Sequence, residues 1–129
     1  TDSARNILGE TVSRKDAVFN LGRLGLLVNS FSKGDLGDLK YATQDMLHQP
    51  QRQKLFFPMK NIIKGALDAG AYGAFLSGAG STVIAITDSR EYTIGYEMAD
   101  AAMKSGIEGN IFVSSIVNQG VQLIEQGED

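Results

Sequence analysis

Residues 70–82 read GAYGAFLSGAGST, and this stretch decides the fold. The apolar runs Ala71–Leu76 and Thr82–Thr87 flank the glycine-rich turn Ser77–Ser81. Short apolar runs on either side of a turn of small residues are typical of two paired strands. The pattern therefore predicts an antiparallel hairpin whose turn carries two glycines separated by one alanine.

Helical spacing of apolar residues surrounds this hairpin on both sides. Ahead of it the pattern predicts three helices, over 14–32, from Asp35 to Leu47, and from Met59 to a stop at Gly70. Behind it the pattern predicts one helix, over 90–104 and closed by Gly106. The segment 48–58 is bracketed by Pro50 and Pro58 and is interpreted as an irregular connection, which in a compact domain is often functional.

The first predicted helix carries the clearest local signals. Ser13 followed three residues later by Asp16 resembles a capping box, which fixes the start of a helix. Gly22 and Gly25 inside the helix each cost about 1 kcal/mol relative to alanine. We therefore expect another backbone to pack closely against them. Residues 1–12 show little periodicity and are interpreted as a short helical turn or a loop.

Apolar residues alternate again after the last helix. Residues 111–117 read IFVSSIV, which predicts a third strand, and residues 121–124 could extend it or pair with it. The fold class is thus α+β, with three short strands and four helices. Nothing ahead of residue 13 supplies the further strand that would complete a four-stranded sheet. We infer from this gap that the chain is a piece of a longer protein.

Composition excludes several classes of protein. The 129 residues suit one domain and contain no cysteine, which excludes thiolate zinc sites, iron–sulfur clusters, cysteine nucleophiles and disulfides. One histidine, His48, excludes a multi-histidine metal site. The net charge of −3 argues against nucleic acid as a partner, and no apolar run is long enough to span a membrane.

The turn between the strands is the first candidate site. In Leu76–Thr82 two glycines and flanking hydroxyl residues would let backbone N–H groups converge on an anion, as in a phosphate nest. The alternative is an ordinary hairpin turn that needs positive φ, and short glycine loops are common. Spacing alone favours the ordinary turn.

Two arginines are the remaining candidates. Arg52 lies in the proline-bracketed segment near His48, and its guanidinium could hold a carboxylate with two hydrogen bonds. A solvated loop arginine or a structural ion pair explains Arg52 equally well. Arg23 interrupts an apolar helix, so it either extends to solvent or points a charge at a ligand. His48 alone is more often structural than catalytic.

No general base stands out in the sequence. The acidic pairs Asp35/Asp38 and Glu97/Asp100 have the spacing of helix caps and exposed faces. The chain contains no P-loop, no G-x-S-x-G motif and no H-E-x-x-H motif. Chemistry performed by these residues unaided is therefore not expected.

Taken together, these segments resemble the C-terminal domain of the GHMP kinase superfamily, and within it the homoserine kinases. The resemblance starts at Thr1–Leu8 and runs through the motifs Ser13–Arg23, Gly34–Leu36 and Leu47–Arg52. It is strongest over Gly70–Thr82, which is similar to the third signature of the superfamily. The combination is specific, although no single motif is.

The resemblance implies a fold and an activity. The fold would be a ferredoxin-like antiparallel sheet covered by helices, lacking its first strand, with residues 1–129 forming the C-terminal domain. The activity would be ATP-dependent phosphorylation of the L-homoserine hydroxyl to O-phospho-L-homoserine, in the cytoplasm and on the way to threonine. An ATP-binding N-terminal domain would precede Thr1 and would be this chain's partner, so the chain alone is expected to be inactive.

The resemblance also implies roles for residues. Arg52 matches an arginine that binds the substrate carboxylate, and Arg23 matches a second arginine near it. Ser77, Gly78, Ala79 and Gly80 match the loop beside the phosphate and nucleotide site. No residue of this chain is assigned a catalytic or metal-binding role, and ATP and Mg²⁺ would be held chiefly by the N-terminal domain.

Other interpretations stay open. A homodimer is possible. The chain could belong to another GHMP kinase, acting on sugar or mevalonate-pathway substrates, although two arginines aimed at one carboxylate favour an amino acid. It could instead be a noncatalytic ferredoxin-like module that binds a small effector or a partner protein through an uncovered sheet edge.

Overall fold

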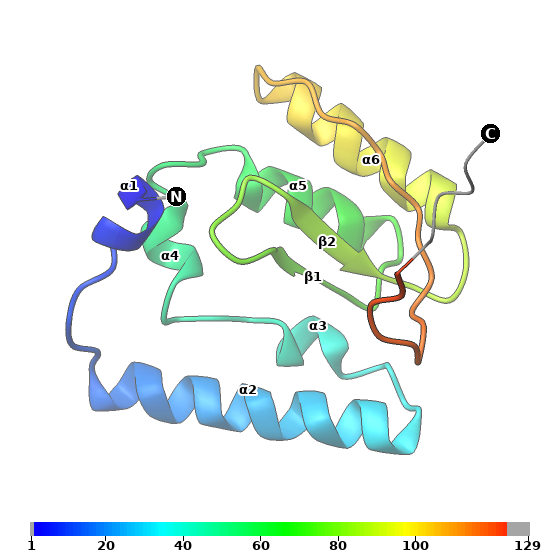
Figure 1. The fold of residues 1–129 in the computed structure, drawn as a ribbon. Coiled ribbons are helices and arrows are strands. Elements are labelled where there is room, and N and C mark those ends of the chain that lie inside the picture. The colour runs from blue at the N-terminus through cyan, green and yellow to red at the C-terminus, as the bar shows by residue number, and fades with distance from the viewer. Residues whose placement is uncertain (1, 124–129) are drawn as a thin grey trace.

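The structure is a computed structural model that describes residues 2–123 (Figure 1). Its elements, in chain order, are α1 (Asp2–Asn6), α2 (Arg14–Lys33), α3 (Leu39–Ala42), α4 (Gln49–Arg52), α5 (Met59–Asp68), β1 (Gly73–Leu76), β2 (Val83–Ile86) and α6 (Glu91–Lys104). Within the described range, no helix combines the length and the apolar character that crossing a membrane requires. The class is α+β, as predicted.

The predicted hairpin is confirmed and organises the molecule. β1 and β2 form an antiparallel two-stranded sheet in which Gly73 pairs with Ile86 and Leu76 pairs with Val83. Helix α5 packs on both strands and α6 packs on α5, whereas α3 contacts β1 and α2 packs on α3. In Figure 1 the sheet accordingly lies between the α5–α6 pair and the α2–α3 pair.

Small side chains fill the core between the sheet and α5. Ala66, Ala69, Ala71, Ala74 and Ile94 form one buried cluster. Because alanine adds little bulk, the helix can lie close to the strands and bury its apolar face. The full burial of Leu39 and Leu76 closes the opposite side, between α3 and β1.

Helix α2 begins and ends as predicted. The Ser13 hydroxyl oxygen accepts from the Asp16 backbone N–H at 3.0 Å, and the hydroxyl donates to the Asp16 carboxylate at 2.7 Å. At the other end Gly34 adopts the left-handed conformation, φ 69°, and its N–H donates to the Phe31 carbonyl. These two local signals therefore fix the ends of the longest helix.

The expected close packing at Gly22 and Gly25 is wrong for the part of the chain that the structure describes. A Cβ atom built on either glycine would have nothing within 4 Å. The neighbouring apolar side chains Val18 and Leu21 are 61% and 67% exposed. Helix α2 thus turns Phe19 and Arg23 toward the body of the domain and leaves these glycines on the outer face.

The predicted helix from Asp35 to Leu47 is much shorter in the structure. Only Leu39–Ala42 is helical, and the segment interpreted as irregular contains α4. The chain leaves the helix at Thr43, whose hydroxyl donates to the Leu39 carbonyl at 2.8 Å. Three residues after α3, the Asp45 carboxylate accepts the backbone N–H groups of His48 and Gln49, which starts α4 instead.

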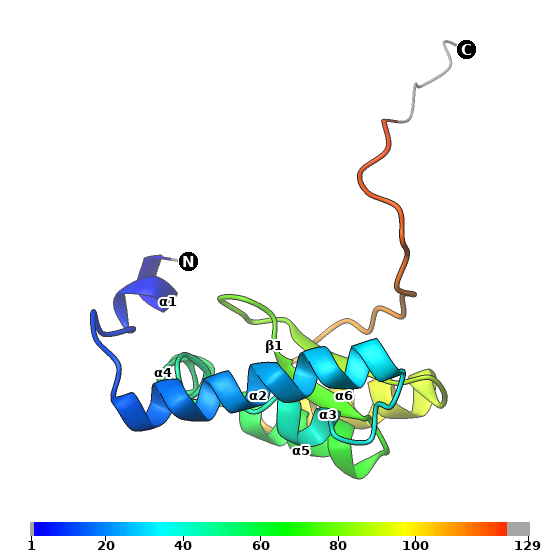
Figure 2. The same ribbon diagram turned by 90° about the horizontal axis from the view of Figure 1, so that it is seen from below.

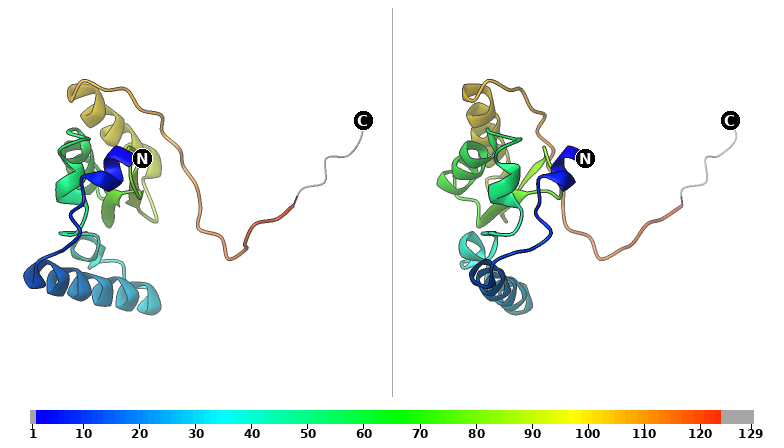
Figure 3. Two further views of the ribbon diagram at one scale, coloured as in Figure 1. Left: turned by 60° about the vertical axis from the view of Figure 1, so that its left-hand side comes forward. Right: turned by 90° about the vertical axis from the view of Figure 1, so that its left-hand side faces the viewer.

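The predicted third strand is wrong for this structure. Residues 111–117 form no strand, and neither do residues 121–123 of the possible extension, whose last residue, Ile124, lies outside the described residues. Ile111 still lies against α6 at Gly95, and beyond it Figures 2 and 3 show the chain leading away from the helices and the sheet. A strand needs a neighbour for its N–H and C=O groups, and β1 and β2 pair only with each other among the described strands.

Candidate functional site

Arg52, the last residue of α4, joins three segments that are far apart in the sequence. Its Nη1 atom donates to the Gly78 carbonyl at 2.6 Å, and its Nε atom donates to the Ala4 carbonyl at 3.2 Å. The structure therefore brings two of the predicted features, Arg52 and the glycine turn, into direct contact. Through the Ala4 carbonyl, the same arginine also contacts the short helix α1.

The glycine turn is an exposed hairpin loop with its own hydrogen bonds. Ser77 N–H donates to the Thr82 carbonyl at 2.8 Å, and Gly80 N–H donates to the Ser77 carbonyl at 3.0 Å. Gly78 and Gly80 have φ of 53° and 85°, a region that favours glycine. A Cβ atom at Gly78 would meet nothing within 4 Å, so this side of the loop is open to a ligand.

His48 lies beside Arg52 and accepts from it. The distance from Arg52 Nη1 to His48 Nδ1 is 3.1 Å, so the neutral ring carries its proton on Nε2, which lies 3.9 Å from the Asp45 carboxylate. Burial lowers the pKa of His48; the Asp45 carboxylate raises it, the Arg52 charge lowers it, and the net direction is down. A neutral His48 can orient the guanidinium, and the structural role expected for it stays a prediction.

Asp45 holds the start of α4 in place. Its carboxylate accepts from the backbone N–H groups of His48 at 2.7 Å and Gln49 at 2.6 Å, and from the Asn20 amide at 2.7 Å. Burial alone would raise the pKa of Asp45, but these hydrogen bonds lower it below its ordinary value. The charged carboxylate therefore fastens α4 to α2 through Asn20.

Arg23 lies on the inner side of α2. Its guanidinium stacks 4.2 Å above the centre of the Phe19 ring, and its buried Nε atom has no hydrogen-bond partner among the described residues. It lines a cleft of about 220 Å³ together with Asp45 and His48. Arg23 and Arg52 thus both lie near His48, but Arg52 contacts the His48 ring and Arg23 only shares its cleft.

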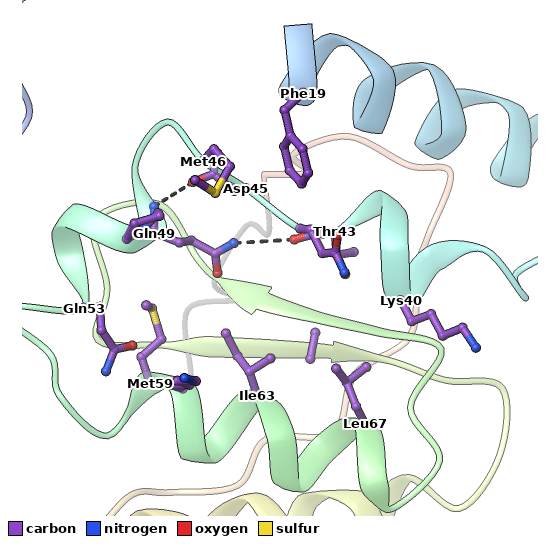
Figure 4. Close-up of a pocket in the computed structure, with 14 residues that line it drawn as sticks. Phe19, Lys40, Thr43, Asp45, Met46, Gln49, Gln53, Met59, Ile63 and Leu67 are labelled. Atoms are coloured by element: carbon purple, nitrogen blue, oxygen red, sulfur yellow. Dashed lines mark hydrogen bonds between the residues drawn. The ribbon is translucent and has the colours of Figure 1, made fainter. Parts of the chain in front are cut away.

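A second, larger cleft of about 460 Å³ lies on the other side of the segment 43–49 (Figure 4). Apolar side chains of α2 and α5, among them Phe19, Ile63 and Leu67, form much of its wall. Gln49 lines both clefts. The segment that carries Asp45 and Gln49 therefore separates an apolar hollow from the Arg23 cleft.

The described residues include no group of three or more acidic or histidine side chains that could hold a metal ion. Asp45, the acidic residue nearest to Arg52 in sequence, is engaged by backbone and amide N–H groups. This part of the chain therefore does not fit a Mg²⁺ site. What it offers is guanidinium groups and an open glycine loop.

Sequence analysis missed three parts of this arrangement. Asp45 precedes the start of α4 in a position from which it can receive backbone N–H groups, a signal the sequence does contain. The buried amide of Gln49 and the approach of α1 have no local signal, because their partners are 27 and 48 residues away. The contact at Ala4 also brings the exposed Arg5 to the edge of the site.

Comparison with known proteins fits this fold. The family described as "GHMP kinases C terminal" matches residues 26–102. Homoserine kinase of Caldicellulosiruptor bescii is 44% identical over 107 residues, which are 83% of this chain and 33% of that protein. Homoserine kinase of Clostridium beijerinckii is 35% identical over 97% of this chain and 42% of its own length.

A solved structure gives the same answer. The crystal structure of homoserine kinase from Cytophaga hutchinsonii superposes with a TM-score of 0.83 at 32% identity, covering 90% of this chain and 38% of that chain. The chain belongs to the GHMP kinase C-terminal domain family. Within that family it is homologous over nearly its whole length to homoserine kinases, and it spans about two fifths of the length of the Clostridium and Cytophaga proteins.

Proposed function

We propose that this chain is the acceptor-binding C-terminal part of a homoserine kinase. The whole enzyme would transfer the γ-phosphate of ATP to the hydroxyl of L-homoserine and release O-phospho-L-homoserine, in the cytoplasm and in threonine biosynthesis. The observation that supports the proposal is the hydrogen bond from Arg52 to the Gly78 carbonyl, because a guanidinium is suited to bind a carboxylate and this one lies against the glycine loop.

In this proposal Arg52 and Arg23 bind the carboxylate of homoserine. A guanidinium presents paired N–H donors to a carboxylate, so one or two arginines fix the position of a small amino acid. The buried Nε atom of Arg23, which has no partner among residues 2–123, is available for this role. Arg5 is a further candidate, since it follows Ala4, whose carbonyl accepts from Arg52.

The loop residues Ser77, Gly78, Ala79 and Gly80 support the phosphate side of the site. Phosphoryl transfer depends mainly on alignment and on stabilisation of charge, so a domain without a general base can still be essential. When bound, ATP with Mg²⁺ supplies the phosphoryl group, and the N-terminal domain of the longer protein would hold both. Homodimers of that longer protein are part of the same proposal.

The test uses the full-length protein encoded with this chain. We expect ATP consumption that depends on L-homoserine and produces O-phospho-L-homoserine, detected by mass spectrometry. Mevalonate and galactose serve as controls for the other GHMP kinases. Equal or better turnover of either control, or none with homoserine, would contradict the proposal.

The chain by itself is the second arm of that test. Residues 1–129 at the same concentration should consume no ATP in response to homoserine, because the nucleotide site belongs to the rest of the protein. Homoserine-dependent ATP consumption by this chain alone would contradict the proposal that the nucleotide site lies in the N-terminal domain.

A further inference from the structure

Gln49 connects α4 to the base of the glycine loop. Its side chain is buried, 9% exposed, and its Oε1 atom accepts from the backbone N–H of Leu76 at 2.9 Å. Leu76 is the last residue of β1 and directly precedes the loop. On its other side the amide donates a longer bond, 3.4 Å, to the Thr43 carbonyl (Figure 4).

Two parallel connections therefore hold α4 against the loop. One is the Gln49 bond to Leu76, and the other is the Arg52 bond to the Gly78 carbonyl. A two-point grip on a substrate carboxylate uses Nη2 of Arg52 together with either Nη1 or Nε. Nη1 already donates to the Gly78 carbonyl and to His48, and Nε donates to the Ala4 carbonyl. Arg52 must therefore release one of these partners to bind the carboxylate in this way. The Gln49 connection makes no such exchange, because its amide is uncharged and buried and forms no charge-assisted hydrogen bond with a carboxylate.

We propose that Gln49 is a positioning residue for the acceptor, acting through Arg52; this inference rests on the function proposed above. When Arg52 exchanges the Gly78 carbonyl for a carboxylate, the Gln49 amide keeps α4 at its distance from the loop. Arg52 then stays in place to bind the acceptor carboxylate, so the affinity of the enzyme for homoserine depends on Gln49.

Asp45 makes Gln49 rigid enough for this role. It accepts the backbone N–H of Gln49 at 2.6 Å, so the backbone of residue 49 is fixed at one end and its amide at the other. Asn20 ties Asp45 to α2 in turn. The Gln49 side chain therefore stays bonded to Leu76 when Arg52 releases Gly78.

The test is a double-mutant cycle in the full-length enzyme. Gln49→Met keeps the size of the side chain and removes both hydrogen bonds, and we expect the homoserine KM to rise about tenfold while the ATP KM changes less than about twofold. Gln53→Met, one turn away, is the matched control and should leave both constants unchanged, because among the described residues the Gln53 side chain bonds to the Phe57 carbonyl and not to the loop. In an Arg52→Ala background, Gln49→Met should raise the homoserine KM no further.

The results separate this inference from the proposed function. An unchanged homoserine KM in Gln49→Met, or the same tenfold rise in the Arg52→Ala background, would overturn the positioning role. If Gln49→Met does not fold, Gln49→Glu keeps the oxygen that accepts from Leu76, and its homoserine KM should stay within about threefold of the parent; a tenfold rise would overturn the proposal.

A parent enzyme inactive on homoserine would instead contradict the proposed function. Amide hydrogen exchange then decides whether Gln49 holds the loop. In Gln49→Met, exchange at Ser77 and Gly80 should be faster than in Gln53→Met, and equal exchange would overturn the inference.

Discussion

The Nε and Nη1 atoms of Arg52 form hydrogen bonds within the protein itself. The Ala4 carbonyl, the Gly78 carbonyl and His48 are all within hydrogen-bond distance of its guanidinium. These partners are neutral, and a carboxylate forms stronger, charge-assisted hydrogen bonds with arginine. In the proposed site a substrate carboxylate can therefore displace them, and Arg52 would already be oriented when the carboxylate binds.

This exchange predicts the effect of removing Arg52. In the full-length enzyme Arg52→Ala should lower kcat/KM for homoserine roughly thirtyfold or more, which corresponds to a loss of about 2 kcal/mol of transition-state stabilisation. Steady-state kinetics with varied homoserine measures it, and Arg23→Ala and Arg5→Ala run in parallel show which guanidinium shares the carboxylate. Unchanged kinetics in Arg52→Ala would remove this residue from the site.

His48 predicts a pH dependence of stability. Its pKa in the folded chain is below the ordinary 6.5, because burial, and then the Arg52 charge, outweigh the opposing effect of Asp45. Above pH 6.5 the ring is neutral in both states and its contribution is complete. As the pH falls below 6.5 the unfolded chain binds the proton first, so this contribution decreases and is lost as the pH passes the lower folded pKa.

Urea unfolding of this chain at several pH values checks the prediction. The free energy of unfolding should fall more steeply between pH 6.5 and 5 in the parent than in His48→Gln, which does not titrate. Asp45 does not confuse the comparison, because its pKa lies below the ordinary 3.8 and its contribution is lost only at still lower pH. Equal slopes in the two proteins would argue against a neutral, buried His48.

Among the elements, β1 and α3 are packed at a distance that only glycine permits. A Cβ atom on Gly73 would lie 2.8 Å from Thr43 Cγ2 and 3.0 Å from the Leu39 carbonyl oxygen. The second contact is with backbone, so a larger side chain must push α3 away from the sheet. The glycine in this strand is therefore a packing requirement.

We expect Gly73→Ala to lower the free energy of unfolding of this chain by about 1–3 kcal/mol. Gly22→Ala on the outer face of α2 is the matched control, where a Cβ meets nothing within 4 Å. There the same substitution should raise stability by about 0.5–1 kcal/mol, since alanine favours the helix. Urea denaturation of both variants measures the difference, and a stable Gly73→Ala would show that α3 moves freely.

At the scale of the whole molecule, the sheet that the structure describes has two strands. β2 pairs only with β1 among the described strands, and the alternating residues 111–117 lie in an exposed coil. In the longer protein that we propose, a strand from the preceding part completes the sheet and lets this segment pair. The ferredoxin-like arrangement expected from the sequence stays a prediction until that sheet is seen.

Hydrogen exchange on the two forms of the protein tests this completion. Amides of residues 111–117 should exchange rapidly in this chain and at least about a hundredfold more slowly in the full-length protein, because paired strand amides are protected. Residues 83–86 should gain protection as well, on the edge of β2 that faces the new strand. Equal exchange in both forms would show that 111–117 is not a strand of this sheet.

Features whose causes are local could be predicted from the amino-acid sequence. Ser13, Asp16 and Gly34 set the ends of α2, the apolar spacing set α5 and α6, and the glycines of 78–80 set the hairpin turn. The sequence also indicated the family, because residues 70–82 contain the family motif in one continuous segment. Each of these features depends on residues within a few positions of one another.

Features that depend on partners far along the chain could be recognised only in the folded structure. Arg52 meets Ala4 and Gly78 across 48 and 26 residues, and Gln49 meets Leu76 across 27. The failure of 111–117 to form a strand has the same origin, since an alternating pattern specifies which face is apolar but not whether a neighbouring strand exists. Hydrogen bonds between distant segments require both partners to be folded into place, and no local pattern contains the second partner.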